Sequence, residues 1–367
     1  MTRRNEWREV VRPKAGTADM AIDRQKKAEL LQRTIKHIDI KAHDPRPLID
    51  AYREMSFSAR DLGRACELYE RMLQDDDCTI ILTVAGSTSA AGCMQIYVDL
   101  LRHNMVDIVV ATGATVVDMD FLEALGFAHY RGSQFVDDSA LRDLYIDRIY
   151  DTFIDEEELQ HCDRTIKEIA DGLAPGVYSS REFIGEMGRW LTANPARAMK
   201  SDSLVQVAHE RGVPVFCPAF SDSSAGFGLV AHQAERPDAH VSIDSVRDLR
   251  ELTALKIRAR HTGLLMIGGG SPKNFAQDTV VCAEILGHDV PMHKYSVQIT
   301  VADVRDGACS SSSLKEASSW GKVDAAAEQM VFAEATLALP LLAAYAYHNG
   351  SWKKRPRREL ARLLDTV

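Results

Sequence analysis

Apolar residues along the chain follow two different periods. Short continuous runs rich in β-branched residues are typical of strands that are buried on both faces of a parallel sheet. Between these runs, apolar residues stand three or four positions apart, which predicts helices, the first of them over 46–75. The predicted strands span 79–84, 106–111, 213–220, 239–243, 263–267 and 295–301. Strands that alternate with helices in this way predict an α/β fold with parallel strands.

The other segments complete the expected organisation. Residues 1–26 are charged and lack periodicity, so we predict a mobile N-terminal arm. Residues 121–200 are mostly charged and predict helices joined by loops. An apolar run over 331–347 is interrupted by Glu334 and predicts a buried helix in which this carboxylate needs a polar partner. One domain is therefore expected over 27–350, followed by a basic tail on the surface over 351–367.

Composition narrows the class of partner. The chain has 367 residues and a formal net charge of −9, which argues against a nucleic-acid partner and is compatible with a cationic small substrate. The seven cysteines are scattered, odd in number and never spaced as CxxC. This pattern indicates reduced thiols in the cytoplasm, and neither a disulfide framework nor a metal site. No apolar run reaches the length of a membrane span, so no membrane partner is expected.

Small residues follow the first two predicted strands. Gly86-Ser87-Thr88 comes after the first strand, and Thr112-Gly113-Ala114 comes after the second. A helix that begins at such a turn offers free backbone N–H groups to an anion. Two such turns at the ends of neighbouring parallel strands form the crevice in which open α/β sheets bind ligands. The glycine spacing differs from the dinucleotide fingerprint, so plain strand-to-helix turns are an equal alternative.

Two later strand ends carry further candidates. Asp222 follows the third strand, where its carboxylate could accept a hydrogen bond from a ribose hydroxyl; a helix N-cap is an even alternative. Gly268-Gly269-Gly270 follows the strand over 263–267 and would let a ligand approach the backbone closely. Pro272 can open the next helix. Glycine triplets also occur as plain turns, so neither position decides the function alone.

One lysine stands where it could act as a nucleophile. Lys322 follows Trp320 and Gly321, after a serine-rich loop. Beside the indole ring the amine would be poorly solvated, which disfavours the ammonium form. A neutral amine forms an imine with a carbon electrophile. A lysine at a surface turn is the common alternative, since lysine is rarely buried unpaired.

Taken in order, these stretches resemble the deoxyhypusine synthase family over roughly residues 35–345. The resemblance is carried by Arg102-His103-Asn104-Met105-Val106-Asp107, by Pro214-Val215-Phe216-Cys217-Pro218-Ala219, by Gly268-Gly269-Gly270 and by the stretch from Glu316 to Lys322. Members of this family use NAD to attach an aminobutyl group from spermidine to a lysine of a translation factor. The resemblance implies a Rossmann-like, mostly parallel sheet with helices on both faces, in a single NAD-binding domain. It also implies a homotetramer with active sites at dimer interfaces.

The resemblance implies roles for individual residues, none of them in binding a metal. Lys322 matches the lysine that forms the imine. Substrate-binding positions fall on Glu316, Trp320, Asp118, Asn274, Phe227 and Cys309. Cofactor-binding positions fall on Gly86, Ser87, Thr88, Thr112, Gly113, Ala114, Asp118, Asp222, Gly269, Val301, Ala302, Asp306, Glu334 and Ala335.

Departures from the family pattern bear on the substrate. Val117, Phe227 and Cys309 stand where the family places acidic residues that grip the polyamine, and Asn274 stands where it has a histidine. Spermidine, a tri-cation, needs charge-assisted partners at its amines, and this chain offers fewer of them. We therefore expect NAD-dependent transfer of an aminoalkyl group between small amines, such as putrescine or agmatine, through an imine on Lys322.

Three other functions are alternatives, and they differ in whether they require Lys322. A deoxyhypusine synthase would modify a protein lysine with spermidine as donor. A non-catalytic, NAD-binding homologue would have no need to keep Lys322, and an ordinary dehydrogenase has no evident use for a lysine that forms an imine.

Overall fold

A six-stranded sheet forms the centre of the molecule. The structure is a computed structural model, and it describes residues 22–197, 202–305 and 313–364. The strands are all parallel and follow the order β11-β10-β9-β1-β2-β7. They are β1 (Cys78–Val84), β2 (Ile108–Ala111), β7 (Val215–Phe216), β9 (His261–Ile267), β10 (Tyr295–Thr300) and β11 (Glu328–Phe332). The predicted α/β fold with parallel strands is confirmed.

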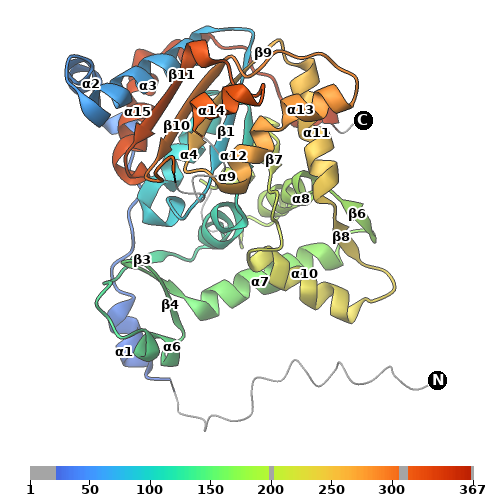
Figure 1. Cartoon of the computed structure of the whole chain (residues 1–367). Coiled ribbons are helices and arrows are strands. Elements are labelled where there is room, and N and C mark those ends of the chain that lie inside the picture. Colours follow the sequence, from blue (N-terminus) through green and yellow to red (C-terminus); the bar gives the residue numbers. More distant parts are fainter. Residues whose placement is uncertain (1–21, 198–201, 306–312, 365–367) are drawn as a thin grey trace.

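Helices cover both faces of this sheet (Figure 1). In β1, Ile80 and Leu82 pack into one apolar cluster and Ile81 packs into another, so the strand is buried on both sides. The first cluster includes α3 (Phe57–Gln74), α4 (Met94–Arg102), α9 (Leu204–Arg211) and α15 (Ala335–Asn349). The second includes α11 (Ser245–Arg258), α12 (Gly270–Gln277) and α14 (Leu314–Ser319), and α13 (Thr279–Ile285) packs against α11. Among the described residues, none of these helices or any other has the length and apolarity needed to cross a bilayer.

Smaller elements surround the main sheet. The antiparallel strands β3 (His129–Arg131), β5 (Thr152–Asp155) and β4 (Ile146–Ile149) form a second sheet. This sheet packs with α1 (Arg24–Leu30) and α6 (Asp138–Asp143). Helix α2 (Arg46–Arg53) packs on α3, in another part of the molecule (Figure 1). Helices α7 (Glu156–Asp171) and α10 (Ser224–Glu235) pack together, and β6 (Gly176–Tyr178) precedes α8 (Ser180–Ala193). The expectation of helices and loops alone over 121–200 is wrong. Strands β3 and β4 are short and partly exposed, and the buried β5 has only four residues, so none of them leaves a continuous apolar run.

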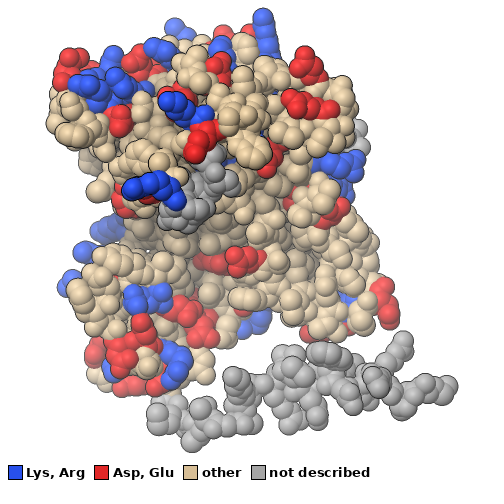
Figure 2. Space-filling view, in the orientation of Figure 1, with Lys and Arg blue, Asp and Glu red and all other residues tan. Residues whose placement is uncertain are grey.

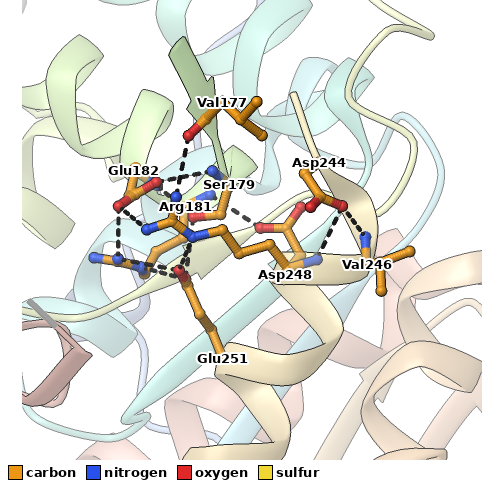
Figure 3. A network of polar contacts seen from close by, with 9 residues as sticks. Val177, Ser179, Arg181, Glu182, Asp244, Val246, Asp248 and Glu251 are labelled. Carbon is orange, nitrogen blue, oxygen red and sulfur yellow. Dashed lines mark hydrogen bonds and ion pairs between the residues drawn. The ribbon is translucent and has the colours of Figure 1, made fainter. Parts of the chain in front are cut away.

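A buried polar network joins the start of α8 to α11 (Figure 3). Arg181 Nε donates to Glu251 Oε2 at 2.7 Å, and the hydroxyl of Ser179 donates to the same oxygen at 3.0 Å. The backbone N–H of Arg181 donates to the fully buried carboxylate of Asp248 at 3.3 Å. The charges of Arg181 and Glu251 therefore neutralise each other where the two helices meet, as buried charges require.

The predicted helix over 331–347 is preceded by a strand that the sequence analysis missed. Strand β11 ends at Phe332, and α15 begins at Ala335. Glu334 is the N-cap residue of α15, and it accepts the backbone N–H of Thr336 at 2.9 Å. The expectation that Glu334 lies inside a helix is therefore wrong. The boundary was hidden because strand and helix are both apolar and no glycine or proline separates them.

Two other predicted strands are corrected. The strand expected over 213–220 is reduced to the two residues of β7, at the edge of the sheet. Pro214 and Pro218 flank β7 and have no N–H to donate, so the ladder stops there. The strand expected over 239–243 is β8 (Val241–Ile243), which pairs with β6 and not with the main sheet.

Both chain ends are more ordered than expected where the structure describes them. Residues 1–21 of the expected arm lie outside the described residues, but residues 24–26 belong to α1. In this helix the Lys27 amine lies 2.7 Å from Asp155 and 2.8 Å from Glu157. The tail over 351–367 contains Arg355, whose side chain is 1% exposed, so its expected position on the surface is wrong for this residue.

Candidate functional site

The carboxyl edge of the six-stranded sheet carries most of the predicted cofactor positions. Strands β2 and β9 lie on opposite sides of β1, so the connections after β1 and β9 diverge. Such a switch opens a crevice at the carboxyl ends of the two strands, where open α/β sheets bind ligands. Gly86-Ser87-Thr88 follows β1 and Gly269 follows β9, while Thr112-Gly113-Ala114, Asp222, Val301-Ala302 and Glu334-Ala335 follow β2, β7, β10 and β11.

The turns after β1 and β9 contact each other. Gly86 and Gly268 have φ angles of 88° and 74°, a conformation that favours glycine. A Cβ on Gly268 would lie 2.9 Å from the carbonyl oxygen of Ala85, so no side chain fits there. A Cβ on Gly86 would meet no atom within 4 Å. The backbone of the turn after β1 is therefore open to a ligand where a side chain would otherwise stand.

The turn after β2 packs against the start of α10. A Cβ on Gly113 would lie 2.6 Å from Ser223 and 3.2 Å from the carbonyl oxygen of Asp222. Ser223 is the N-cap of α10, and its side chain accepts the N–H of Ala225. The capping alternative for Asp222 is therefore wrong. Its side chain is exposed beside the turn after β2.

Asp118 lies in a π-helical segment, η4 (Ala114–Phe121), that follows the same turn. Such segments are frequent at functional sites. Asp118 Oδ1 accepts the backbone N–H of Ser224 at 2.7 Å. Burial raises the pKa of the Asp118 carboxyl to about 6, against the opposing hydrogen bonds from Ser224. The neighbouring Val117 is fully buried in the core, so its side chain does not line a surface that a substrate reaches.

Helix α15, which begins after its N-cap Glu334, packs against η3 (Ser89–Cys93), the segment that follows the β1 turn. The hydroxyl of Tyr97 in α4 lies 2.6 Å from Thr88 Oγ1, which fixes one side of the turn. Burial, and after it the negative charge of Glu334, raises the pKa of the Cys93 thiol to about 12. The positions predicted after β11 and β1 are thus neighbours in space.

The turn that carries Lys322 is a Schellman motif at the end of α14. Gly321 has a φ of 70°, and its N–H donates to the Ser318 carbonyl at 3.0 Å. The N–H of Lys322 donates to the Ala317 carbonyl at 3.1 Å, which completes the motif. The carbonyl oxygen of Lys322 accepts the N–H of His293 at 2.9 Å. The backbone of Lys322 is therefore held from both sides.

The side chain of Lys322 is shielded and paired. Its Nζ lies 2.6 Å from Asp278 Oδ1 and 5.3 Å from the centre of the Trp320 ring. The Lys322 side chain is 18% exposed, whereas that of Asp278 is 40% exposed. Lys322 thus lies at a turn, with its amine partly shielded from solvent and ion-paired. Asp278 could not be predicted from the sequence, because it stands at the junction of α12 and α13, far from Lys322 in the chain and without a motif of its own.

Three other predicted substrate residues lie around this pair. Asn274 is one helical turn before Asp278, whose backbone N–H donates to the Asn274 carbonyl at 2.8 Å. Glu316 is exposed and closes a capping box with Ser313 at the start of α14. The backbone N–H of Ser313, which lies 2.6 Å from Glu316 Oε2, lowers the pKa of Glu316. Trp320 is 68% exposed, so one face of its ring is open to a ligand.

The other predicted substrate positions lie on other segments. Phe227 belongs to α10 and is 63% exposed. Asp306 and Cys309 lie outside the described residues. Among the described residues, the only trio with metal-ligand spacing is Asp75, Asp77 and His261, and Lys294 already lies 2.7 Å from Asp75.

The fold and the site define an open α/β protein with small-residue turns at the carboxyl edge of its sheet and, near the amino end of β10, a partly shielded lysine whose carbonyl oxygen accepts the N–H of His293. The chain belongs to the deoxyhypusine synthase family, since the family profile described as Deoxyhypusine synthase matches residues 47–346. The resemblance and the Rossmann-like, single-domain fold inferred from the sequence are confirmed, and membership makes the chain a transferase.

Individual relatives agree with this assignment. The chain is 66% identical over 340 residues to a deoxyhypusine synthase-like protein of Coxiella burnetii, covering 93% of this chain and 96% of the relative. It is 39% identical over 313 residues to the "Probable deoxyhypusine synthase 2" of Methanosarcina mazei, covering 85% and 89%. A solved structure from Entamoeba histolytica, described as a "putative deoxyhypusine synthase", shares the fold with a TM-score of 0.55 at 18% identity, covering 89% of this chain and 99% of that one.

Proposed function

We propose that the protein transfers an aminoalkyl group between small amines, with NAD as cofactor and an imine on Lys322 as intermediate. The observation that carries the proposal is the Lys322 amine, shielded from solvent between Asp278 and the ring of Trp320. A lysine in a site of low solvation serves as a nucleophile in covalent group transfer. An ordinary dehydrogenase would have no use for it.

The residues at the carboxyl edge fit NAD. The open backbone at Gly86 offers N–H groups to a pyrophosphate at the start of a helical segment. The exposed carboxylate of Asp222 is available to a ribose hydroxyl. NAD, when bound, supplies the removal and return of a hydride at the carbon beside an amine. The chain itself binds and orients the amine, excludes water and supplies Lys322.

The side chains near the site favour a small amine over spermidine. An ammonium that loses its carboxylate partner is costly to bury, and Phe227 presents an apolar ring at one such position. Glu316 would hold one cationic end, and a guanidinium would stack on Trp320. Putrescine and agmatine are therefore the proposed substrates. The second candidate is modification of a protein lysine, which the 39% identity to the Methanosarcina mazei relative supports.

The proposed assembly is a homotetramer with active sites at dimer interfaces. Exposed apolar side chains on α10 and nearby elements support it: Val177, Phe227, Val230 and Val246. The surface around α10 is mostly uncharged (Figure 2). A second copy of the chain would remove such a surface from water. The free cysteines of the described part, five of six buried, fit the reducing cytoplasm as the proposed location.

Mass spectrometry of the products tests the proposal. The protein is incubated with NAD and with putrescine, agmatine, spermidine, or spermidine together with a translation-factor protein, and borohydride is added during turnover. We expect products from putrescine or agmatine and a reduced adduct on Lys322. Lys322→Ala should abolish turnover and leave NAD affinity unchanged, because this lysine bonds to substrate and not to cofactor. An adduct on another lysine, or modification of the translation factor alone, would contradict the proposal.

A further inference from the structure

We propose that Asp278 is a catalytic residue that serves as counter-ion and proton acceptor for Lys322 during transfer. This inference rests on the proposed function and extends it to a residue at the junction of α12 and α13. Asp278 Oδ1 lies 2.6 Å from Lys322 Nζ, within the range for direct proton transfer.

The backbone holds Asp278 in place independently of Lys322. Its N–H donates to the Asn274 carbonyl at 2.8 Å, and its own carbonyl accepts the N–H of Cys282 at 2.9 Å. Aspartate is a preferred helix-capping residue. Here its side chain makes no capping hydrogen bond to α13. The carboxylate is thus not used to start the helix and is paired with Lys322 instead.

The charge at Nζ explains why a fixed carboxylate belongs there. Nζ is positive in the resting ammonium and positive again in a protonated imine. A carboxylate at constant distance stabilises both states without reorganisation. The Lys322 side chain is only 18% exposed, so the attraction is less screened than in open water. The 40% exposure of Asp278 leaves room for a substrate nitrogen on its other side.

The proposed step conserves protons and charge. The proton moves from Lys322 Nζ to Asp278 Oδ1, which leaves a neutral amine. This amine attacks the carbon of the protonated substrate imine that hydride removal by NAD would produce, and a C–N bond forms that leaves Nζ positive. The departing nitrogen takes one proton from Nζ, and its own C–N bond breaks with its electron pair. Asp278 gives its proton to the freed amine. The products are an ammonium ion and a protonated imine on Lys322 beside the Asp278 carboxylate.

Reductive trapping without NAD tests this role. The whole protein is treated with butanal and cyanoborohydride between pH 6 and pH 9, and adducts are located by peptide mass spectrometry. The exposed Lys315 on α14 serves as the internal standard. Asp278→Asn is compared with the unaltered protein and with Asp289→Asn, which removes an exposed carboxylate after α13. Thermal melting establishes that each variant is folded.

We expect Asp278→Asn to lower the yield of the Lys322 adduct, and this loss to grow as pH rises. Cyanoborohydride reduces the protonated imine, and the carboxylate keeps the imine protonated. The adduct at Lys322 should be near the unaltered level at pH 6 and at least about tenfold lower at pH 9, since an acid–base group typically contributes about 100-fold or more. Asp289→Asn should behave as the unaltered protein, and Asp278→Glu, which keeps the charge, should stay within about threefold of it.

Two results separate this inference from the proposed function. An unchanged yield in Asp278→Asn, or a loss of equal size at every pH, overturns the role of Asp278 and leaves the nucleophile intact. If Lys322 of the unaltered protein reacts no better than Lys315, the imine on Lys322 itself is overturned, and the role of Asp278 with it. If Asp278→Asn does not fold, Asp278→Glu decides the question. A loss of the Lys322 adduct that grows with pH in the folded Asp278→Glu variant contradicts the counter-ion role of Asp278.

Discussion

Arg355 and Asp107 form a buried ion pair: Nη2 and Oδ2 lie 2.7 Å apart, and each side chain is 1% exposed. Arg355 also donates to the carbonyl oxygens of Asn104 at 2.6 Å and Cys78 at 3.0 Å. Asp107 accepts the backbone N–H of Ile80 at 2.8 Å. The segment after α15 therefore closes the amino edge of the sheet, opposite the edge that carries most of the predicted cofactor positions.

Arg355→Met should lower the free energy of unfolding by about 3–5 kcal/mol, because it leaves the Asp107 carboxylate buried without its partner. Urea denaturation measures the change. Arg357→Met is the matched control: Arg357 pairs with Glu359 at 3.2 Å with its side chain 44% exposed, and its loss should cost less than about 1 kcal/mol. Equal small losses in both variants would show that the buried pair does not hold the C-terminal segment.

Gly321→Ala should separate backbone strain from chemistry. Gly321 has a φ of 70° and nothing within 4 Å of an added Cβ, so the substitution costs conformational strain only, about 1 kcal/mol. Gly287→Ala has the same features, with a φ of 81°. We expect similar losses of melting temperature in both variants and a loss of turnover in Gly321→Ala alone, because only that turn positions Lys322. Equal turnover in the two variants would argue against such positioning.

Asp222→Ala should weaken NAD binding by about 1–3 kcal/mol, the range for removing one partner of a hydrogen bond at a binding site. The carboxylate is exposed beside the turn after β2 and does not cap α10. Isothermal titration calorimetry measures the affinity. Asp238→Ala, which changes an exposed carboxylate in the turn after α10, is the control and should bind NAD normally. Identical affinities in the two variants would remove Asp222 from the cofactor site.

Asp248 should make stability fall as pH rises. Burial raises the pKa of Asp248 to about 7 from its ordinary 3.8, against hydrogen bonds from Ser180 and Arg181. A carboxyl whose pKa is higher in the folded state contributes stability that is full below pH 4 and lost as pH rises through 7. The slope from this group is about 1.4 kcal/mol per pH unit between those limits. Asp248→Asn should flatten the profile of unfolding free energy against pH between 4 and 7, and parallel profiles for both proteins would contradict the assignment.

Phe227→Asp, together with Cys309→Asp, should shift substrate preference toward spermidine, because each new carboxylate supplies a partner for an ammonium. Phe227 is 63% exposed in the single chain, so the acid itself is accommodated, and at the proposed dimer interface its charge would be paired with the substrate ammonium. The ratio of product formed from spermidine to that from putrescine measures the shift. Ala234→Asp, which adds a carboxylate at another exposed position of α10, is the control and should leave the ratio unchanged. The same ratio in all three proteins would exclude Phe227 from the substrate site.

Local sequence patterns were sufficient to predict an element where a single interaction determines its residues. The run over 79–84 consists of leucine and β-branched residues because β1 is buried on both faces, and this pattern can be recognised without knowledge of the neighbouring strands. The glycine before Lys322 marks the left-handed residue that ends α14. β11 escaped prediction, since the boundary between a buried strand and a buried helix leaves no change in polarity.

The sequence by itself determined the α/β class, the turns at the strand ends and the candidate nucleophile, because each depends on contacts between near neighbours in the chain. The tertiary structure decided which of these turns meet, that Val117 lies in the core, and that Arg355 is buried. It also decided that Asp278 faces Lys322. These pairings join residues far apart in sequence, and a charge gains its partner only once helices and strands have packed, so no local pattern encodes them.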